Sequence, residues 1–115
     1  MHKRITFKGM EHSAPMEQEA NKQLEKVEKF LLEEDRTPIY IDLVLEPSRV
    51  HSHHKIELRV KSPSFDRISN YEGPEFYLVL SRVIDVMYRE LHEDKRKLDE
   101  EKRMVGRHDE FKRER

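Results

Sequence analysis

The residues whose types and spacing best suit metal binding are a histidine cluster at four consecutive positions, His51, Ser52, His53 and His54. Imidazoles two and three residues apart can share a metal ion. They fall in a polar connection between two expected strands, and no acidic or cysteine partner stands at a recognisable spacing. Two interpretations stay open: a polar turn whose charge depends on pH, or the ligand set of a metal-dependent enzyme.

Other catalytic patterns are missing from the sequence. It contains no histidine–glutamate zinc motif, no serine elbow and no cysteine, and its 3 glycines are too few for a phosphate-binding glycine loop. We therefore expect no enzyme, no cofactor and no small-molecule substrate. The N-terminus has no signal-peptide core and no stretch approaches the length of a membrane span, so a cytoplasmic protein without membrane contact is expected.

Two rows of cations offer a second kind of chemistry, the binding of phosphate groups. Lys22, Lys26 and Lys29 share one flank of a first expected helix. In a second one, arginines recur every seven residues and drift by only ~20° per step; they are Arg82, Arg89, Arg96 and Arg103, with Lys95 beside them. Rows of long cations match phosphates along a nucleic-acid backbone. The formal net charge of -1 means that any such surface must arise from local segregation of charge.

The alternative is a solvated helix face whose charges neutralise one another. Three pairs of opposite charges stand four residues apart: Asp85 with Arg89, Arg96 with Glu100, and Asp99 with Arg103. Exposed pairs of this kind contribute only ~0.3–0.5 kcal/mol each, so a phosphate could still compete for the arginines. Both interpretations remain possible from periodicity alone.

The elements that must position these residues follow from hydrophobic spacing. Strands are expected at 4–8, 39–46, 55–61 and 65–71, the last with an ambiguous inward set, and helices at 14–34 and 76–104. Ser13 and Pro15 predict the start of the first helix. Residues 105–115 are charged and are expected to form a disordered tail after a single domain at 1–104.

This order predicts an α/β fold, a two-layer sandwich of β-α-β-β-β-α type. A four-stranded sheet with both helices packed on one face would bury every apolar stripe and leave the lysine and arginine flanks outside.

Two segments then resemble a known family. Ile5-Thr6-Phe7-Lys8-Gly9-Met10-Glu11 and the later run Leu24-Glu25-Lys26-Val27-Glu28-Lys29-Phe30 are similar to the opening of the ribosome hibernation-promoting factor and protein Y family, also called sigma-54 modulation proteins. Glu75-Phe76-Tyr77 and Met87-Tyr88-Arg89-Glu90-Leu91 loosely match its later signature. The resemblance covers about residues 4 to 97.

The resemblance implies a ribosome-associated translation inhibitor. Such proteins bind the small ribosomal subunit through ribosomal RNA and block the channel for messenger and transfer RNA under stress or in stationary phase. Together with the arginine stripe, it defines eight candidate RNA-binding residues: Lys22, Lys26, Lys29, Tyr77, Arg82, Arg89, Lys95 and Arg96. Arg82 and Arg96 rest on the periodic stripe rather than on the family match.

The chain also departs from the family pattern. His92 and Glu93 stand where the family is often basic, and Glu90 replaces a usual glutamine. Longer members carry a C-terminal dimerisation domain for which this chain has no room, so a monomer is expected away from the ribosome. The alternative function is a non-ribosomal protein-interaction module of the same fold, which would use the exposed sheet face or Leu78, Val79 and Val86.

Overall fold

The computed structural model describes residues 1–48 and 52–113, with side chains described up to Arg103. The elements follow in the order β1 (His2–Phe7), α1 (Ala14–Glu34), β2 (Tyr40–Pro47), β3 (His54–Lys61), β4 (Asp66–Gly73) and α2 (Phe76–Arg113). The predicted fold class is confirmed, and each predicted strand lies within two residues of the observed one.

The four strands form one mixed sheet in the order β1-β2-β3-β4. β1 runs parallel to β2, and the other neighbours are antiparallel. A parallel pair needs a crossover connection, which α1 supplies. The helix begins as predicted, because the Ser13 hydroxyl accepts a hydrogen bond from the Met16 amide at 3.4 Å and Pro15 occupies the first turn.

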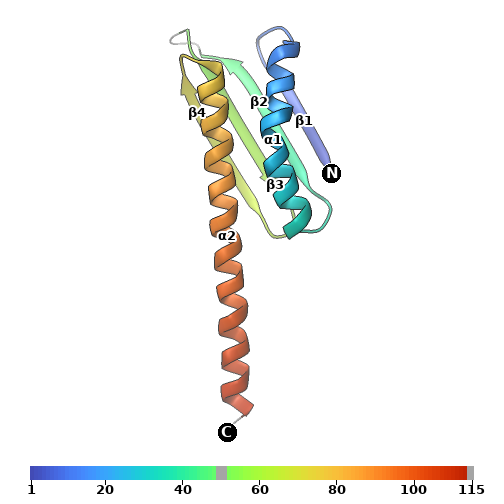
Figure 1. The fold of residues 1–115 in the computed structure, drawn as a ribbon, viewed down its shortest axis with the longest axis vertical. Coiled ribbons are helices and arrows are strands. Elements are labelled where there is room, and N and C mark those ends of the chain that lie inside the picture. Colours follow the sequence, from blue (N-terminus) through green and yellow to red (C-terminus); the bar gives the residue numbers. More distant parts are fainter. Residues whose placement is uncertain (49–51, 114–115) are drawn as a thin grey trace.

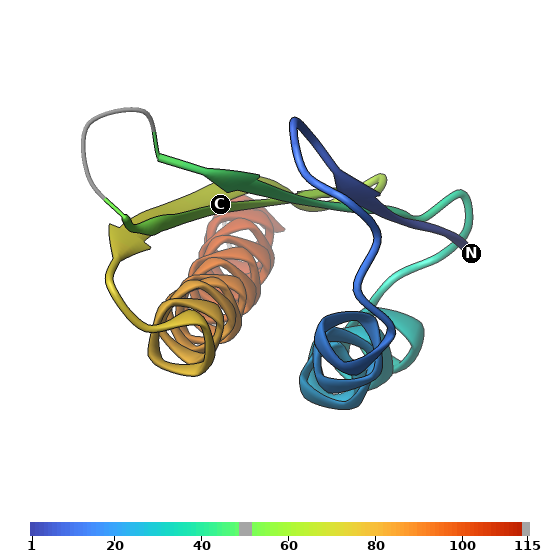
Figure 2. The ribbon, with the colours of Figure 1, turned by 90° about the horizontal axis from the view of Figure 1, so that it is seen from above.

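Both helices cover the same face of the sheet, α1 on the side of β1 and α2 on the side of β4 (Figure 1, Figure 2). The core lies between the two layers. It is formed by side chains at most 5% exposed, including Leu24, Val27 and Leu31 of α1, Leu43 and Leu58 of the sheet, and Leu80, Ile84, Met87 and Leu91 of α2. Burial of these apolar stripes drives the packing of the helices onto the sheet.

β4 has polar residues on both faces, which explains why its inward set was ambiguous in the sequence. Arg67 and Ser69 both face the helices. The buried Ser69 hydroxyl donates to the carbonyl oxygen of Val83 at 3.0 Å, and the Arg67 guanidinium donates to Asp94 of α2. Buried polar groups are tolerated when they are hydrogen-bonded in this way.

The predicted end of the second helix at Met104 is wrong, because α2 continues to Arg113. Figure 1 shows it extending well past the end of the sheet. Residues 76–113 contain no proline and only Gly106 as a strong helix breaker, and opposite charges such as Asp109 and Arg113 stand four apart. The division into a domain at 1–104 and a tail at 105–115 stays a prediction.

Candidate nucleic-acid interface

The two helices lie side by side and run in the same direction. The Ser81 hydroxyl, near the start of α2, donates to Gln23 in the middle of α1 at 3.1 Å. Lys95 of α2 pairs with Glu34 at 3.0 Å near the end of α1. Between these two contacts, Lys26 forms an ion pair with Asp85. These contacts form a seam between α1 and α2, which brings the lysine row of α1 beside α2. This is the arrangement that one continuous surface of cations requires.

The lysine row of α1 points away from the sheet. Lys22 and Lys29 are exposed, and neither makes a hydrogen bond or ion pair with any residue that the structure describes. Lys26 is engaged twice, by Asp85 and by the ring of Tyr88, whose centroid lies 5.1 Å from its ammonium nitrogen. Two of the three predicted lysines are thus available to a ligand, and the third lies in the seam.

Arg89 is an accessible cation of α2. The expected pairing with Asp85 does not form, because Asp85 turns to Lys26 on the neighbouring helix. Arg89 is exposed and has no hydrogen-bonding or ionic partner within the described part of the chain. It lies one turn from Asp85 along α2, on the outward face, because the adjacent flanks contact α1 and β4.

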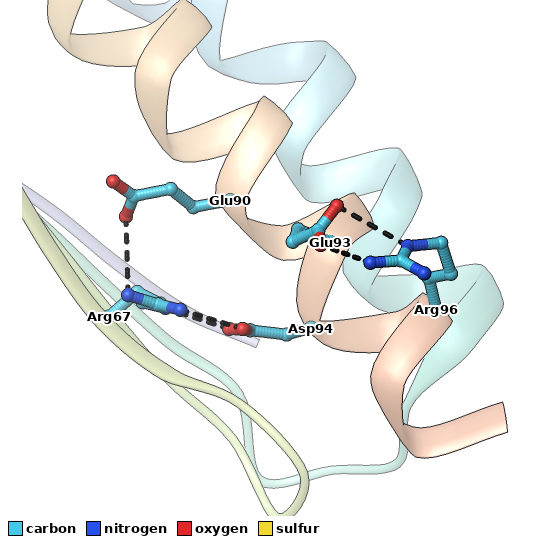
Figure 3. Close-up of polar contacts among 5 residues, drawn as sticks. All are labelled: Arg67, Glu90, Glu93, Asp94 and Arg96. Atoms are coloured by element: carbon cyan, nitrogen blue, oxygen red, sulfur yellow. Dashed lines mark hydrogen bonds and ion pairs between the residues drawn. The ribbon is translucent and has the colours of Figure 1, made fainter. Parts of the chain in front are cut away.

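Arg96 is held by its own helix, in contrast. Its guanidinium pairs with Glu93 (Figure 3). It also pairs with Glu100 at 2.7 Å, so this predicted i,i+4 pair is confirmed. The hydrogen bond with Glu93 raises the pKa of Arg96 and lowers that of Glu93. Lys95 is similarly occupied, and its hydrogen bond with Glu34 raises the pKa of Lys95. Both cations must exchange a partner to bind a phosphate.

The last two candidate residues lie away from the seam or at its start. The Arg82 guanidinium lies 5.6 Å from the ring centroid of Tyr71 on β4, which places it on the flank of α2 remote from α1. Tyr77 is 50% exposed in the first turn of α2, beside Phe76. Of the candidate cations, Lys26 and Lys95 contact the opposite helix across the seam, Arg96 contacts its own helix, and Arg82 lies on the flank of α2 beside β4.

Sequence reasoning missed a second cluster of charges, on the β4 side of α2. Arg67 donates to both carboxylate oxygens of Asp94 at 2.8 and 2.7 Å and lies 3.7 Å from Glu90 (Figure 3). The hydrogen bonds from Arg67 lower the pKa of Asp94. The only signal in the sequence was an arginine at an inward position of a weak strand. This cluster fastens α2 to the sheet edge and so fixes the direction of the outward arginines.

The other chemistry considered in the sequence finds little geometric support. His51 lies outside the described residues, and His54 packs its ring against Phe76 with centroids 5.7 Å apart. Within 1–48 and 52–113 no group of three potential ligands could hold a metal ion. Of the apolar residues named for protein docking, Val79 is buried in the core, whereas Leu78 is 66% exposed.

A membrane span is not found either: no helix in the described segments combines the length and the apolar composition needed to cross a bilayer.

The chain is thus an α/β protein, a two-layer β-α-β-β-β-α domain with cations along its paired helices. Residues 4–99 match the family described as Sigma 54 modulation protein / S30EA ribosomal protein, and the chain belongs to that family. This confirms the resemblance seen in the sequence. No curated protein matches the chain.

Two solved structures share the fold. A ribosomal subunit interface protein from Coxiella burnetii is 16% identical, with a TM-score of 0.63 over 83% of this chain and 98% of that chain. The N-terminal domain of Protein Y from Thermus thermophilus is 17% identical, with a TM-score of 0.61 over 84% and 98%. Nearly all of each neighbour is therefore matched, while part of this chain has no counterpart in them. The family match also stops at residue 99, so the distal part of α2 lies beyond it.

Proposed function

We propose that the chain is a ribosome hibernation factor, which binds the small ribosomal subunit through ribosomal RNA under stress or in stationary phase. Membership of the S30EA family supports this proposal, and so does the name of one neighbour of the same fold, a ribosomal subunit interface protein. The role would place the protein in the cytoplasm, acting as a monomer away from the ribosome.

The observation that carries the proposal is the outward surface over the paired helices. It presents Lys22, Lys29 and Arg89, which have no partner in the described part of the chain, beside the seam that holds Lys26. Long, unpaired cations spaced along two parallel helices suit phosphates that follow an RNA backbone. Because the net charge is only -1, this local arrangement must provide the attraction rather than the charge of the whole molecule.

The proposed mechanism is steric and non-covalent. The protein docks on ribosomal RNA and occupies the channel that messenger and transfer RNA need, without a cofactor and without a chemical step. The family description names no enzymatic activity, which agrees with this mechanism. Arg67 contributes indirectly, because its contacts with Asp94 and Glu90 hold α2 on the sheet in the orientation that presents Arg89.

Competition on purified small subunits tests this function. The protein should co-sediment with vacant subunits, lose affinity as salt rises, and be excluded from subunits already loaded with messenger and transfer RNA. Equal binding to vacant and loaded subunits would contradict occupation of the channel. Binding that does not depend on salt would contradict docking on phosphates.

One observation favours the second candidate, a non-ribosomal protein-interaction module. Leu78 and Tyr77 are adjacent and exposed in the first turn of α2, and neighbouring exposed apolar side chains can form a docking patch. Retention of the protein on a ribosome-free, nuclease-treated fraction, and loss of that retention in Leu78→Ser, would support this module over the ribosomal role.

A further inference from the structure

The seam between α1 and α2 contains three rings in addition to its charges. Phe30 comes from α1, and Tyr88 and His92 come from α2; we call them the aromatic seam. The His92 ring centroid lies 4.6 Å from that of Phe30 and 4.4 Å from that of Tyr88. The Phe30 and Tyr88 centroids are 6.2 Å apart. These separations are typical of aromatic side chains in direct contact.

The aromatic seam leads from the core to solvent. Phe30 is 5% exposed and packs against Phe65, Tyr88 is half-buried, and His92 is exposed. The outermost ring is thus held by two rings beneath it, which are themselves anchored in the core. A ring held in place loses little side-chain entropy when a ligand stacks on it, so it is suited to binding a flat partner.

Cations surround this exposed ring. On a helix, residues three and four positions apart are neighbours. Arg89 stands three residues before His92, and Lys95 and Arg96 stand three and four residues after it. Across the seam, Lys26 lies over Tyr88. Of these four cations, Arg89 has no ionic partner in the described part of the chain, whereas Lys26, Lys95 and Arg96 are paired with carboxylates. A flat ligand on His92 would therefore have one free cation beside it to bind the phosphate next to a stacked nucleobase.

We propose that His92, supported by Tyr88 and Phe30, is a stacking platform for an unpaired RNA base. The inference rests on the proposed RNA-binding function and narrows its ligand to single-stranded RNA. Bases inside a duplex have no free face, whereas bases in loops and single strands stack readily on aromatic side chains. Arg89 binds a phosphate next to the stacked base, and His92 contributes the ring rather than a charge.

The test compares His92→Ala, His92→Phe and His92→Lys in equilibrium binding to short RNA probes. The probes are a single-stranded oligonucleotide, the same backbone with one base removed at each position in turn, and the matching duplex. Because His92 contacts Phe30 and Tyr88, His92→Ala and His92→Lys should lower the melting temperature slightly, and circular dichroism checks that all three variants are folded at the temperature of the binding assay.

Stacking predicts a clear order among the variants. His92→Ala should bind the single strand at least about fivefold more weakly, since loss of one stacked base has an effect of this size or larger. His92→Phe should retain the affinity, and His92→Lys should lose it despite its added charge. Removal of one particular base should weaken binding by the unmodified protein and leave His92→Ala unaffected.

Four results would overturn the proposal, the last of them unchanged binding by His92→Ala. The first is retention of affinity by His92→Lys with loss in His92→Phe, which would make position 92 a phosphate contact. The second is equal binding of single strand, duplex and base-depleted probes. The third is that His92→Ala weakens binding to a protein partner that survives nuclease treatment but does not weaken binding to RNA. If His92→Ala binds small subunits and all probes as the unmodified protein does, the stacking platform is wrong while the ribosomal role stands. If the unmodified protein itself does not bind small subunits, the ribosomal role is refuted.

Discussion

Replacing Arg89 by alanine should weaken binding to small ribosomal subunits much more than replacing Arg96. The two side chains belong to the same face of α2 and carry the same charge, so their phosphate contacts should be equivalent. They differ in what they already bind. Arg89 has no ionic partner in the described structure, whereas Arg96 pairs with Glu93 and Glu100.

The expected difference follows from these contacts. One phosphate contact changes affinity by about five- to eightfold for each tenfold change in salt. Between about 1 M and about 0.1 M salt, one contact therefore strengthens binding roughly five- to eightfold. One exposed i,i+3 or i,i+4 ion pair typically shifts an equilibrium by about twofold. Arg96 must release two such pairs to bind a phosphate, which reduces its contribution to the affinity by about fourfold. Arg89→Ala should therefore weaken binding by about five- to eightfold and Arg96→Ala by about twofold or less.

Titration of fluorescently labelled protein with small subunits over a salt series measures both variants. Arg89→Ala should also reduce the slope of log affinity against log salt by roughly 0.7 to 0.9, the value expected for one phosphate contact. Lys22→Ala provides a second unpaired cation for comparison. An Arg96→Ala defect equal to or larger than that of Arg89→Ala would refute the idea that internal ion pairs decide which cations bind RNA.

Three further outcomes are expected. Asp85→Asn releases Lys26 and removes a negative charge from the surface, so affinity for small subunits in the same titration should rise by about two- to threefold; a fall would contradict the surface assignment. Arg67→Ala should lower the free energy of unfolding by about 1 kcal/mol near neutral pH. Because the folded-state pKa of Asp94 is depressed, the stabilisation by the Arg67–Asp94 pair should be fully present above about pH 4 and disappear as the pH falls further. Urea unfolding of both proteins at several pH values measures this. A stability difference between Arg67→Ala and the unmodified protein that persists at low pH would assign the loss to packing. Leu91→Ala should cost about 2–4 kcal/mol in the same measurement, since its side chain is fully buried; a cost under about 1 kcal/mol would contradict the packing of α2 on the sheet.

Most of the fold could be predicted from the sequence because its apolar spacing is regular. Leu24, Val27 and Leu31 recur at helical intervals and Ile56, Leu58 and Val60 alternate, and all six are buried as the patterns indicate. β4 was less clear, because Arg67 and Ser69 occupy inward positions. Their partners lie on α2, more than ten residues away along the chain, so local patterning could not show that these polar groups are satisfied.

The candidate site was predictable in part, for a related reason. The sequence identified the cations but could not decide their partners, since Asp85 has Arg89 four residues away on its own helix and Lys26 on the neighbouring one. Only the placement of the two helices selects Lys26 and leaves Arg89 available. The same holds for His92, whose contact with Phe30 joins residues 62 positions apart in the chain, 92 against 30. Pairings across a helix seam depend on tertiary geometry, which one-dimensional periodicity does not contain.

The measurement that tests the ribosomal role most directly is co-sedimentation of a charge-reversed double variant with small subunits. Lys26→Glu with Arg89→Glu changes one cation on each helix of the proposed surface. Binding should fall at least about tenfold at about 0.1 M salt, because Arg89 supplies a full phosphate contact and the ion pair with Asp85 about halves the contribution of Lys26. Arg59→Glu with Lys61→Glu makes the same change in charge at exposed positions on the opposite face of the sheet and should bind almost normally. Unchanged binding of the helix variant, or an equal loss in the sheet variant, would contradict docking of the paired helices on ribosomal RNA.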